Sequence, residues 1–265
     1  MEPFLKWAGG KRWLLQGGDL PLPTRKSRLI EPFLGSGAAF FSLAPSSALL
    51  SDVNSELINL YKVIRDHPRE FQRRLAEHHA QHSKDHYYST RASSPLDELS
   101  QAARTLYLNR TCWNGLYRVN ARGKFNVPIG TKTAVIYLNE DFEAYSTQLK
   151  AAEIITCDFE DTISRAKDGD FVFVDPPYTV KHNFNGFIKY NEQLFGWSDQ
   201  MRLRDSLSAA INRGANVALT NADHECVREL YAGLLEYRQL RRQTVLSGLG
   251  KGRGPTTEAL FLSYS

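Results

Sequence analysis

The sequence predicts an α/β protein in which a doubly wound sheet is interrupted by an insertion. Short apolar runs alternate with segments of helical periodicity up to about residue 64, and again from about residue 151 onward. Between these regions the sequence is polar and rich in Tyr, His and Arg, so the alternation stops. Alternating strands and helices form parallel sheets covered by helices, so the two outer regions are predicted to build one sheet.

The first strand–helix units precede residue 65. SRLIEPF (27–33) and ALLSDV (48–53) are predicted strands, and GSGAAFFSLA (35–44) is a glycine turn that opens a helix. A further helix, NSELINLYKVI (54–64), begins with Asn54 or Ser55 as its N-cap and carries apolar side chains at helical spacing.

The insertion is predicted to be mainly helical and to carry a β-hairpin. LSQAARTLYLNR (99–110) has the pattern of a helix. In YRVNARGKFNVPIG (117–130), Gly123 would supply the positive φ of the turn, and Pro128 would end the second strand.

The alternation then resumes. EIITCDF (153–159), DFVFVDPPY (170–178), NVALTN (216–221), RQTVL (242–246) and EALFLSY (258–264) are predicted strands. EDTISRAK (160–167), SDQMRLRDSLSAAINRG (198–214) and ADHECVRELYAGL (222–234) are predicted helices. Ser198 is the expected cap of the longest of them, and Gly214 is expected to end it.

The composition indicates an intracellular protein with reduced cysteines. Its excess of basic residues is compatible with binding to nucleic acid. The 265 residues include 33 Lys and Arg against 29 Asp and Glu, a net charge of +4. The basic residues form a mid-chain and a C-terminal cluster, either of which solvation alone would also explain: Arg104, Arg110, Arg118, Arg122, Lys124 and Lys132; and Arg238, Arg241, Arg242, Lys251 and Arg253. The three cysteines are widely spaced, and no signal-peptide core or membrane-spanning apolar run is present, so no metal site and a cytoplasmic location are expected.

The tetrapeptide DPPY (175–178) directly follows a buried-strand pattern. Prolines cannot donate backbone hydrogen bonds, and each restricts the residue before it, so the chain leaves the sheet stiffly. Ligands of open α/β sheets bind at the carboxyl ends of strands. Asp175 and Tyr178 are therefore predicted to be fixed at a ligand-binding edge; the alternative is a stiff turn that caps the next helix.

Two further motifs indicate a nucleoside-like ligand. In EPFLGSGAAFF (31–41), Gly35 and Gly37 allow close approach to the backbone, but the third glycine of a dinucleotide fingerprint and a P-loop Lys are absent. Asp52 ends the second predicted strand, where a carboxylate can bind both ribose hydroxyls. The alternatives are a packing turn and a helix cap. In FLKWAGGKRWLL (4–15), Trp7 and Lys11 offer a ring wall and a cation for a carboxylate, or the segment docks its aromatic side chains on the core.

Together, DPPY, the glycine turn, the acidic end of the second strand and the leading KWAGGK resemble the Dam-type DNA adenine-N6 methyltransferases, in the alpha-group order of motifs. NRTCWNGLYRVNARGKFNVPIG (109–130) is similar to the recognition region of that family, and SGLGKGRGPTTEALFLSY (247–264) to its C-terminal strands. The resemblance covers essentially the whole chain. It implies a Rossmann-like S-adenosylmethionine-dependent methyltransferase sheet, with residues 1–60 and 151–265 as catalytic domain and 61–150 as target-recognition domain.

The resemblance also implies the residues that hold S-adenosylmethionine. Trp7 and Lys11 would line its methionine end, Gly35 and Gly37 would allow close approach, and Asp52 would hold the ribose. Asp158 and Phe159 would bind the adenine ring, by a hydrogen bond and by stacking, and Asp175 would border both cofactor and target base.

The catalytic residues implied are Asp175, Pro176, Pro177 and Tyr178. Adenine N6 is a poor nucleophile because its lone pair is delocalised into the ring. Two acceptors, the Asp175 carboxylate and the Pro176 carbonyl, can hold its hydrogens and stabilise the positive charge that develops on nitrogen. Tyr178 would stack on the target base, which must leave the duplex. The loop TVKHNFNGF (179–187) would close over that base, or is an ordinary surface loop.

Double-stranded DNA is the expected partner, and GATC the expected site. Arg118 is the candidate for bidentate contact to guanine, Trp113 and Asn114 for insertion near the extruded base, and Leu116 and Pro128 for apolar contacts. Arg122 and Lys124 are expected to contact phosphate. Trp113 is bulkier than the Tyr or Phe common in the family. The alternatives are a methyltransferase acting on RNA or a protein amide, and a catalytically silent DNA-binding regulator.

Overall fold

The structure is a computed structural model that describes residues 1–24, 27–120, 124–180, 195–243 and 255–264. The chain divides into two compact units. Unit 1 comprises Met1–Leu20 and Leu34–Cys157, and unit 2 comprises Pro21–Phe33 and Asp158–Ser265. No helix among the described residues combines the length and apolar character that crossing a membrane requires.

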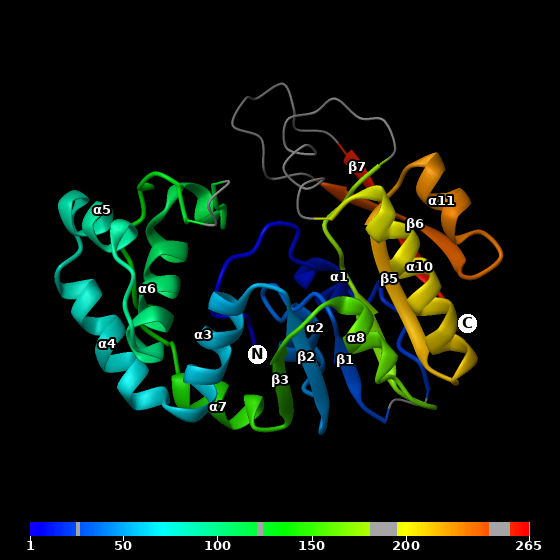
Figure 1. Cartoon of the computed structure of the whole chain (residues 1–265), viewed down its shortest axis with the longest axis horizontal. Coiled ribbons are helices and arrows are strands. Elements are labelled where there is room, and N and C mark those ends of the chain that lie inside the picture. Colours follow the sequence, from blue (N-terminus) through cyan, green and yellow to red (C-terminus); the bar gives the residue numbers. More distant parts are fainter. Residues whose placement is uncertain (25–26, 121–123, 181–194, 244–254, 265) are drawn as a thin grey trace. The chain divides into compact units, whose positions relative to one another are not determined.

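A seven-stranded mixed sheet confirms the α/β class. Its strand order is β3-β2-β1-β4-β5-β7-β6 (Figure 1). The strands are β1 (Leu29–Glu31), β2 (Ala48–Asp52), β3 (Ala152–Thr156), β4 (Phe171–Val174), β5 (Asn216–Ala222), β6 (Glu236–Gln243) and β7 (Pro255–Leu262). The pairs β2–β3, β1–β4 and β4–β5 are parallel, whereas β7 is antiparallel to both β5 and β6.

Unit 1 combines β2 and β3 with helices. These are α1 (Arg12–Gln16), α2 (Ala38–Leu43), α3 (Ser55–Asp66), α4 (Pro68–Ala80), α5 (Lys84–Ala92), α6 (Glu98–Thr111), the 3₁₀ turn η1 (Trp113–Gly115) and α7 (Phe142–Leu149). Helix α6 packs against α3, α4 and α5 (Figure 1). Asn54 is the N-cap of α3, because its side chain accepts a hydrogen bond from the Leu57 N–H, so of the two predicted caps Asn54 is the correct one.

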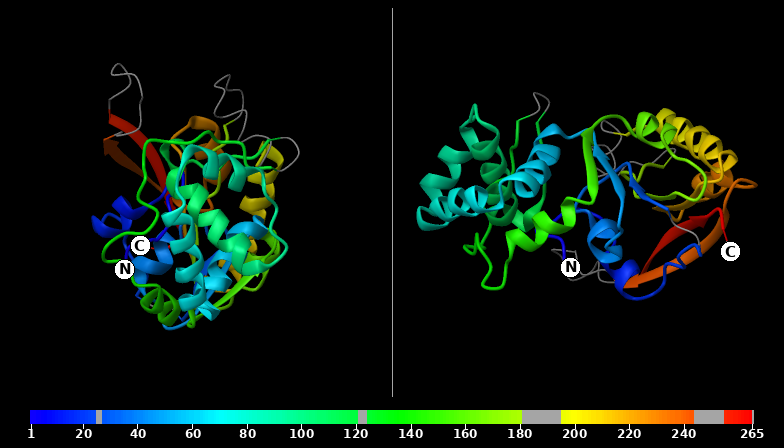
Figure 2. Two further views of the ribbon diagram at one scale, coloured as in Figure 1. Left: turned by 90° about the vertical axis from the view of Figure 1, so that its left-hand side faces the viewer. Right: turned by 90° about the horizontal axis from the view of Figure 1, so that it is seen from below.

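Unit 2 contains the remaining strands with α8 (Phe159–Ser164), α10 (Trp197–Asn212) and α11 (Glu225–Tyr231). Helix α10 packs against α8, α11 and β5. Figure 2 shows β6 and β7 running side by side, in register from Glu236 opposite Leu262 to Gln243 opposite Pro255. Strand β4 is buried along its whole length, as its unbroken Phe and Val run predicted.

Two predictions at the ends of elements in unit 2 are wrong. Ser198 does not cap α10: the cap is Gly196, whose N–H is bound by the Asp199 carboxylate at 2.8 Å. The predicted strand 242–246 begins earlier, at Glu236, because charged side chains on the exposed β6 mask the strand pattern. Residues 244–246 of that prediction lie outside the described residues. Gly214 does end α10, with φ +89°.

The predicted hairpin is also only partly correct. In the described part of 117–130, one bridge pairs Val119 with Phe125, without regular strands on either side. Pro128 does not end the pairing, because the next residue, Ile129, forms a bridge with Cys112, and the Pro128 carbonyl accepts the Trp113 N–H at 2.9 Å. Proline has no backbone N–H but keeps its carbonyl oxygen, so Pro128 can still accept a backbone hydrogen bond. Gly123 lies outside the described residues.

Candidate active site

The end of β4 places Asp175 where the sequence predicts it. Val174 of β4 is opposite Leu219 of the parallel strand β5, so the next residue of β5, Thr220, lies beside Asp175. The Thr220 hydroxyl donates to Asp175 Oδ1 at 2.7 Å. Thr220 is fully buried and Asp175 is half-buried. The carboxylate is therefore held by the sheet at the edge where ligands of such sheets bind.

Tyr178 is anchored by its hydroxyl, which donates to Glu258 Oε2 on β7 at 2.9 Å. Burial raises the pKa of Tyr178 well above its ordinary value, and the nearby Asp175 and Glu258 charges raise it further. The phenol consequently keeps its proton and remains a hydrogen-bond donor. Asp175 and Tyr178 thus belong to one polar cluster, in which Thr220 and Glu258 are the partners that sequence reasoning missed.

Asp158 and Phe159 lie together at the start of α8. Asp158 is the N-cap and accepts the Glu160 N–H at 2.9 Å. The buried Phe159 ring stacks on Phe33, with centroids 5.3 Å apart and planes 22° apart. Arg202 connects the two predicted cofactor residues, because its guanidinium lies 4.8 Å over the Phe159 ring and donates to Asp158 Oδ1 at 2.8 Å. Phe33 lies in the EPFLGSG motif and could have been found there, whereas nothing in the sequence marks Arg202.

The glycine turn in unit 1 requires its glycines. Gly35 and Gly37 have φ of +47° and +66°, in the left-handed region. A Cβ on Gly35 would lie 2.7 Å from Trp7 Cδ1, so the indole of the predicted cofactor residue Trp7 packs directly against this backbone. Trp7 also stacks on Tyr117, with centroids 5.2 Å apart.

Asp52 organises the same turn. Its carboxylate accepts the Gly35 N–H at 3.2 Å and the Asn54 N–H at 3.0 Å. Burial raises the Asp52 pKa, although these backbone hydrogen bonds oppose the shift. The capping role, an alternative for Asp52, belongs to Asn54. Asp52 is therefore a half-buried carboxylate beside a glycine backbone, an arrangement that suits two hydroxyl donors.

Lys11 is a buried cation in unit 1. Only 1% of the residue is exposed, and its ammonium donates to the Gly9 carbonyl. An ammonium can donate to a carboxylate ligand. Lys11 as a cation and Asp52 as an acceptor are thus compatible with a ligand that has one carboxylate and a ribose.

Trp113 and Asn114, which are predicted to insert near the extruded base, form a strained, exposed turn. Asn114 has φ 57°, a left-handed conformation, and Trp113 is 52% exposed. A large aromatic side chain in water and a strained backbone are both features of binding sites. Leu116 is half-exposed and Pro128 is exposed, and Pro128 is tied to Trp113 by the backbone hydrogen bond described above.

The predicted DNA-reading residues beyond that turn are exposed. Arg118 donates through Nε to Asn126 Oδ1 at 2.9 Å, so its side chain is oriented by its hairpin partner. Lys124 is exposed, and its N–H is bound by Asn120 Oδ1 at 3.1 Å. Arg122 lies outside the described residues.

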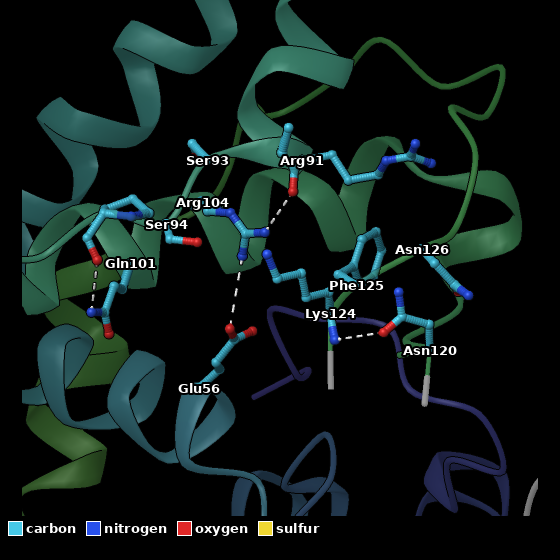
Figure 3. Close-up of a pocket in the computed structure, with 12 residues that line it drawn as sticks. Glu56, Arg91, Ser93, Ser94, Gln101, Arg104, Asn120, Lys124, Phe125 and Asn126 are labelled. Atoms are coloured by element: carbon cyan, nitrogen blue, oxygen red, sulfur yellow. Dashed lines mark hydrogen bonds and ion pairs between the residues drawn. The ribbon is translucent and has the colours of Figure 1, made fainter. Parts of the chain in front are cut away.

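A basic pocket of about 470 Å³ lies beside Lys124, and residues of the α5–α6 connection together with Asn120 and residues 124–126 line it (Figure 3). Arg91, Arg104 and Lys124 line it, against one carboxylate, Glu56. Arg104 donates to the Thr90 and Arg91 carbonyls at 3.0 and 2.9 Å, so its guanidinium is held in place where it lines the pocket. The side chain of Lys124 extends toward it in Figure 3.

A second concentration of charge lies beneath the strained turn. The Lys6 side chain packs against Gly115, where a Cβ would meet Lys6 Cδ at 2.7 Å. Burial, together with the hydrogen bond and charge of Lys132, lowers the Lys6 pKa to about 8. Two amines held together in this way favour a nearby anion.

Comparison with known proteins shows the family of the chain. Residues 7–245 match the family described as D12 class N6 adenine-specific DNA methyltransferase. The chain belongs to this family. It is 36% identical to the type II methyltransferase M1.LlaDCHI of Lactococcus lactis subsp. cremoris, over 100% of this chain and 96% of that protein. It is 32% identical to the DNA adenine methylase of Escherichia coli K12, over 98% and 94% of the two chains.

A phage protein is also similar. The DNA N-6-adenine-methyltransferase of Escherichia phage P1 is 38% identical over 86% of this chain, which corresponds to 31% of the phage protein. The predicted enzyme class is thereby confirmed: the chain is an adenine-specific DNA methyltransferase, and its family uses S-adenosylmethionine as methyl donor.

Proposed function

We propose that this methyltransferase recognises a short site in duplex DNA, with GATC as the first candidate, and methylates an adenine that has been turned out of the helix. The observation that carries the proposal is the Asp175 carboxylate at the end of β4, held by the buried Thr220. A fixed acceptor is what an aromatic amine needs in order to become nucleophilic.

In this proposal Asp175 and the Pro176 carbonyl accept hydrogen bonds from the N6 amino group. These two acceptors favour the geometry in which the nitrogen lone pair is free to attack. Positive charge then develops on N6, and the Asp175 carboxylate stabilises it more in the transition state than in the ground state. The ring of Tyr178 stacks on the extruded base, and Pro177 keeps the segment stiff.

The bound S-adenosylmethionine supplies an electrophilic methyl group. Lys11 is proposed to bind its carboxylate, Asp52 its ribose hydroxyls, and Asp158 and Phe159 its adenine, with Trp7, Gly35, Gly37 and Asp175 bordering it. The buried ammonium of Lys11 and the half-buried carboxylate of Asp52, which accepts hydrogen bonds from the glycine turn, support these roles. Arg202 is added as the residue that orients Asp158 and Phe159.

Residues 61–150 are proposed as the target-recognition domain, with the remaining Rossmann-like sheet as the catalytic domain. Arg118 reads a guanine edge, and Trp113 and Asn114 enter the base step at the target. Their exposure and the strained conformation of Asn114 support this role. Leu116 and Pro128 supply apolar contacts, and Arg122 and Lys124 contact phosphate, with Arg91 beside Lys124 in the basic pocket.

The test is transfer of labelled methyl from S-adenosylmethionine to four substrates. These are a duplex with GATC, the same duplex premethylated on both adenines, a scrambled duplex, and an RNA of the same sequence. Label on unmethylated GATC alone is the expected result, and it establishes target atom and site together.

The other outcomes separate the alternatives. If the scrambled duplex is labelled as well, the proposed methyl transfer stands, but Arg118 does not restrict the enzyme to GATC. Label on RNA favours an RNA-directed enzyme. Cofactor binding without transfer to any substrate points to another recognition sequence or to a silent regulator, and calls for a duplex library before GATC is abandoned.

A further inference from the structure

Two buried polar residues outside the DPPY tetrapeptide contact its two functional side chains. Thr220 of β5 donates to Asp175 Oδ1 at 2.7 Å, and Glu258 of β7 accepts from the Tyr178 hydroxyl at 2.9 Å. Thr220 is 0% exposed and Glu258 is 9% exposed. All four residues belong to unit 2, whose antiparallel strand β7 therefore contributes to the end of the parallel strand β4.

Strand register explains why these two positions reach the tetrapeptide. In the antiparallel pair β5–β7, Thr220 is opposite Leu260 and Ala222 is opposite Glu258. Paired residues share a face and side chains alternate along a strand, so Thr220 and Glu258 project from the same face of the sheet. Asn221, between them on β5, projects from the opposite face, where it donates to Gln200 of α10 at 3.1 Å.

The Thr220–Asp175 hydrogen bond fixes the orientation of the carboxylate. A threonine side chain is stiff about χ1, and here its hydroxyl also lies 3.4 Å from the Val174 carbonyl. A hydrogen bond from a buried hydroxyl to a carboxylate is short and charge-assisted. Loss of the hydroxyl removes one restraint on rotation of the Asp175 carboxylate, so the acceptor oxygen is held less firmly at the position that the target amine requires.

The Tyr178–Glu258 hydrogen bond fixes the ring in the same way. A buried carboxylate is costly without a donor, and the Tyr178 hydroxyl supplies one. Burial and the nearby carboxylates raise the pKa of Tyr178 well above its ordinary value, which favours the protonated hydroxyl that donates to Glu258. Glu258 thus restrains the side-chain torsions of Tyr178 and so the direction in which its ring points.

We propose that Thr220 and Glu258 are positioning residues for methyl transfer: Thr220 holds the acceptor carboxylate of Asp175, and Glu258 holds the ring of Tyr178 against the target base. The inference rests on the proposed roles of Asp175 and Tyr178. It assigns to the C-terminal strand β7, which carries no residue of the proposed cofactor or DNA sites, a part in the chemical step.

The experiment compares pairs of variants that differ in one polar group. Thr220→Val removes the hydroxyl at almost constant shape, and Thr220→Ser restores it. Glu258→Leu removes the acceptor, and Glu258→Gln keeps an oxygen that can accept from Tyr178. Tyr178→Phe and the double variant Tyr178→Phe/Glu258→Leu test whether Glu258 acts through the tyrosine hydroxyl.

The readout is the single-turnover rate of methyl transfer at saturating cofactor and duplex DNA, with separate measurement of both affinities and of thermal unfolding. Thr105→Val and Glu236→Gln are the matched controls. Thr105 is buried and its hydroxyl donates to a backbone carbonyl, whereas Glu236 is exposed on β6, the neighbour of β7. Neither control is expected to change the rate.

The expected result is a rate about 10- to 100-fold lower for Thr220→Val, the effect of losing one hydrogen bond to a charged group, with cofactor and DNA affinities almost unchanged. Thr220→Ser should recover most of this loss. Glu258→Leu should lower the rate by about 10-fold and Glu258→Gln by less. Glu258→Leu should have little further effect in the Tyr178→Phe background, because coupled positions are not additive.

Two outcomes overturn the inference. Equal rates for Thr220→Val and the native enzyme would show that Thr220 is not a positioning residue. If Glu258→Leu lowers the rate as much in the Tyr178→Phe background as in the native enzyme, Glu258 does not act through the tyrosine hydroxyl. If Glu258→Leu does not fold, Glu258→Gln against Tyr178→Phe/Glu258→Gln provides the same comparison. Asp175→Ala in the same assay separates the two levels: an active Asp175→Ala enzyme contradicts the proposed function, whereas an inactive one with a normal Thr220→Val enzyme contradicts the inference alone.

Discussion

The proposed catalytic segment and the proposed DNA-reading turn are stabilised in opposite ways. Asp175 and Tyr178 are each held by a buried side chain on another strand. Arg118, by contrast, is exposed, and its partner Asn126 lies on the same hairpin. Chemistry needs groups that are oriented before the substrate arrives, whereas DNA contacts form in water and can be ordered by the DNA itself. Substitutions in the catalytic segment should therefore lower the rate of methyl transfer. Substitutions in the DNA-reading turn should instead lower DNA affinity and change the sequence preference.

Asp175→Ala should cause the largest effect. Losing the carboxylate removes both the acceptor for the amine and the charge that stabilises the transition state, so we expect the transfer rate to fall at least about 1000-fold. DNA affinity should be almost unchanged, because the exposed turn is intact. The measurement is single-turnover methyl transfer with parallel DNA-binding titrations. Asp205→Asn, a substitution of an exposed carboxylate paired with Arg204, is the control and should behave as the native enzyme.

Asp52→Asn should mainly weaken cofactor binding, by about 10- to 100-fold, because ribose hydroxyls donate more strongly to a carboxylate than to an amide. The pH dependence provides a sharper test. Burial raises the Asp52 pKa, and only the ionised form accepts both hydroxyls, so native affinity should fall as pH decreases through that raised pKa. Calorimetric titration from neutral to acidic pH measures the effect.

The asparagine variant cannot titrate, so it should lose this pH dependence. Asp66→Asn, at an exposed carboxylate paired with Arg65, should retain it. A native affinity that is constant over the acidic range would contradict the role of Asp52.

The sequence was informative where local chemistry determines structure. The buried run before Asp175 predicted β4, and Gly35 and Gly37 predicted a glycine turn ahead of a helix, because both patterns depend on adjacent residues. It was uninformative where long-range pairing decides. Thr220 reaches Asp175 through the parallel register of β4 and β5, and Glu258 reaches Tyr178 through the antiparallel register of β5 and β7, which no local pattern encodes.

The errors have two origins, one local and one long-range. Gly196, not Ser198, caps α10 because the Asp199 side chain folds back to the Gly196 N–H. Arg202 was missed because an arginine on an amphipathic helix has the pattern of an ordinary solvated residue, and only the packing of α10 beside α8 brings it over Phe159. Side chains that support a site from a neighbouring element have no motif of their own.

A comparison of Arg118→Ala with Lys124→Ala should separate reading from anchoring. Loss of a bidentate guanine contact costs about 1–3 kcal/mol and relaxes specificity at one base pair. Loss of a phosphate contact should weaken binding to all sequences alike and reduce the salt slope by about 1. Binding titrations against cognate and single-substituted duplexes at several salt concentrations measure both. Exchanged behaviour of the two variants would reverse their assigned roles.

The smallest effect that we expect concerns Lys6, in unit 1 beneath the strained turn. Its pKa is lowered to about 8 by burial and by Lys132, so it loses its charge as pH rises through that value, before an ordinary lysine does. The charged form attracts DNA phosphate, and binding should therefore take up protons near pH 8. We expect a few-fold loss of DNA affinity between about pH 7 and 9, which binding titrations in matched buffers measure.

Two substitutions identify Lys6 as the source of this dependence. Lys6→Arg keeps its charge throughout the range, so its affinity should remain constant with pH. Lys6→Met should also be constant, but at the lower affinity that the native enzyme reaches at the alkaline end. If both variants retain the native pH dependence, another group titrates, and the proposed attraction between Lys6 and DNA phosphate is wrong.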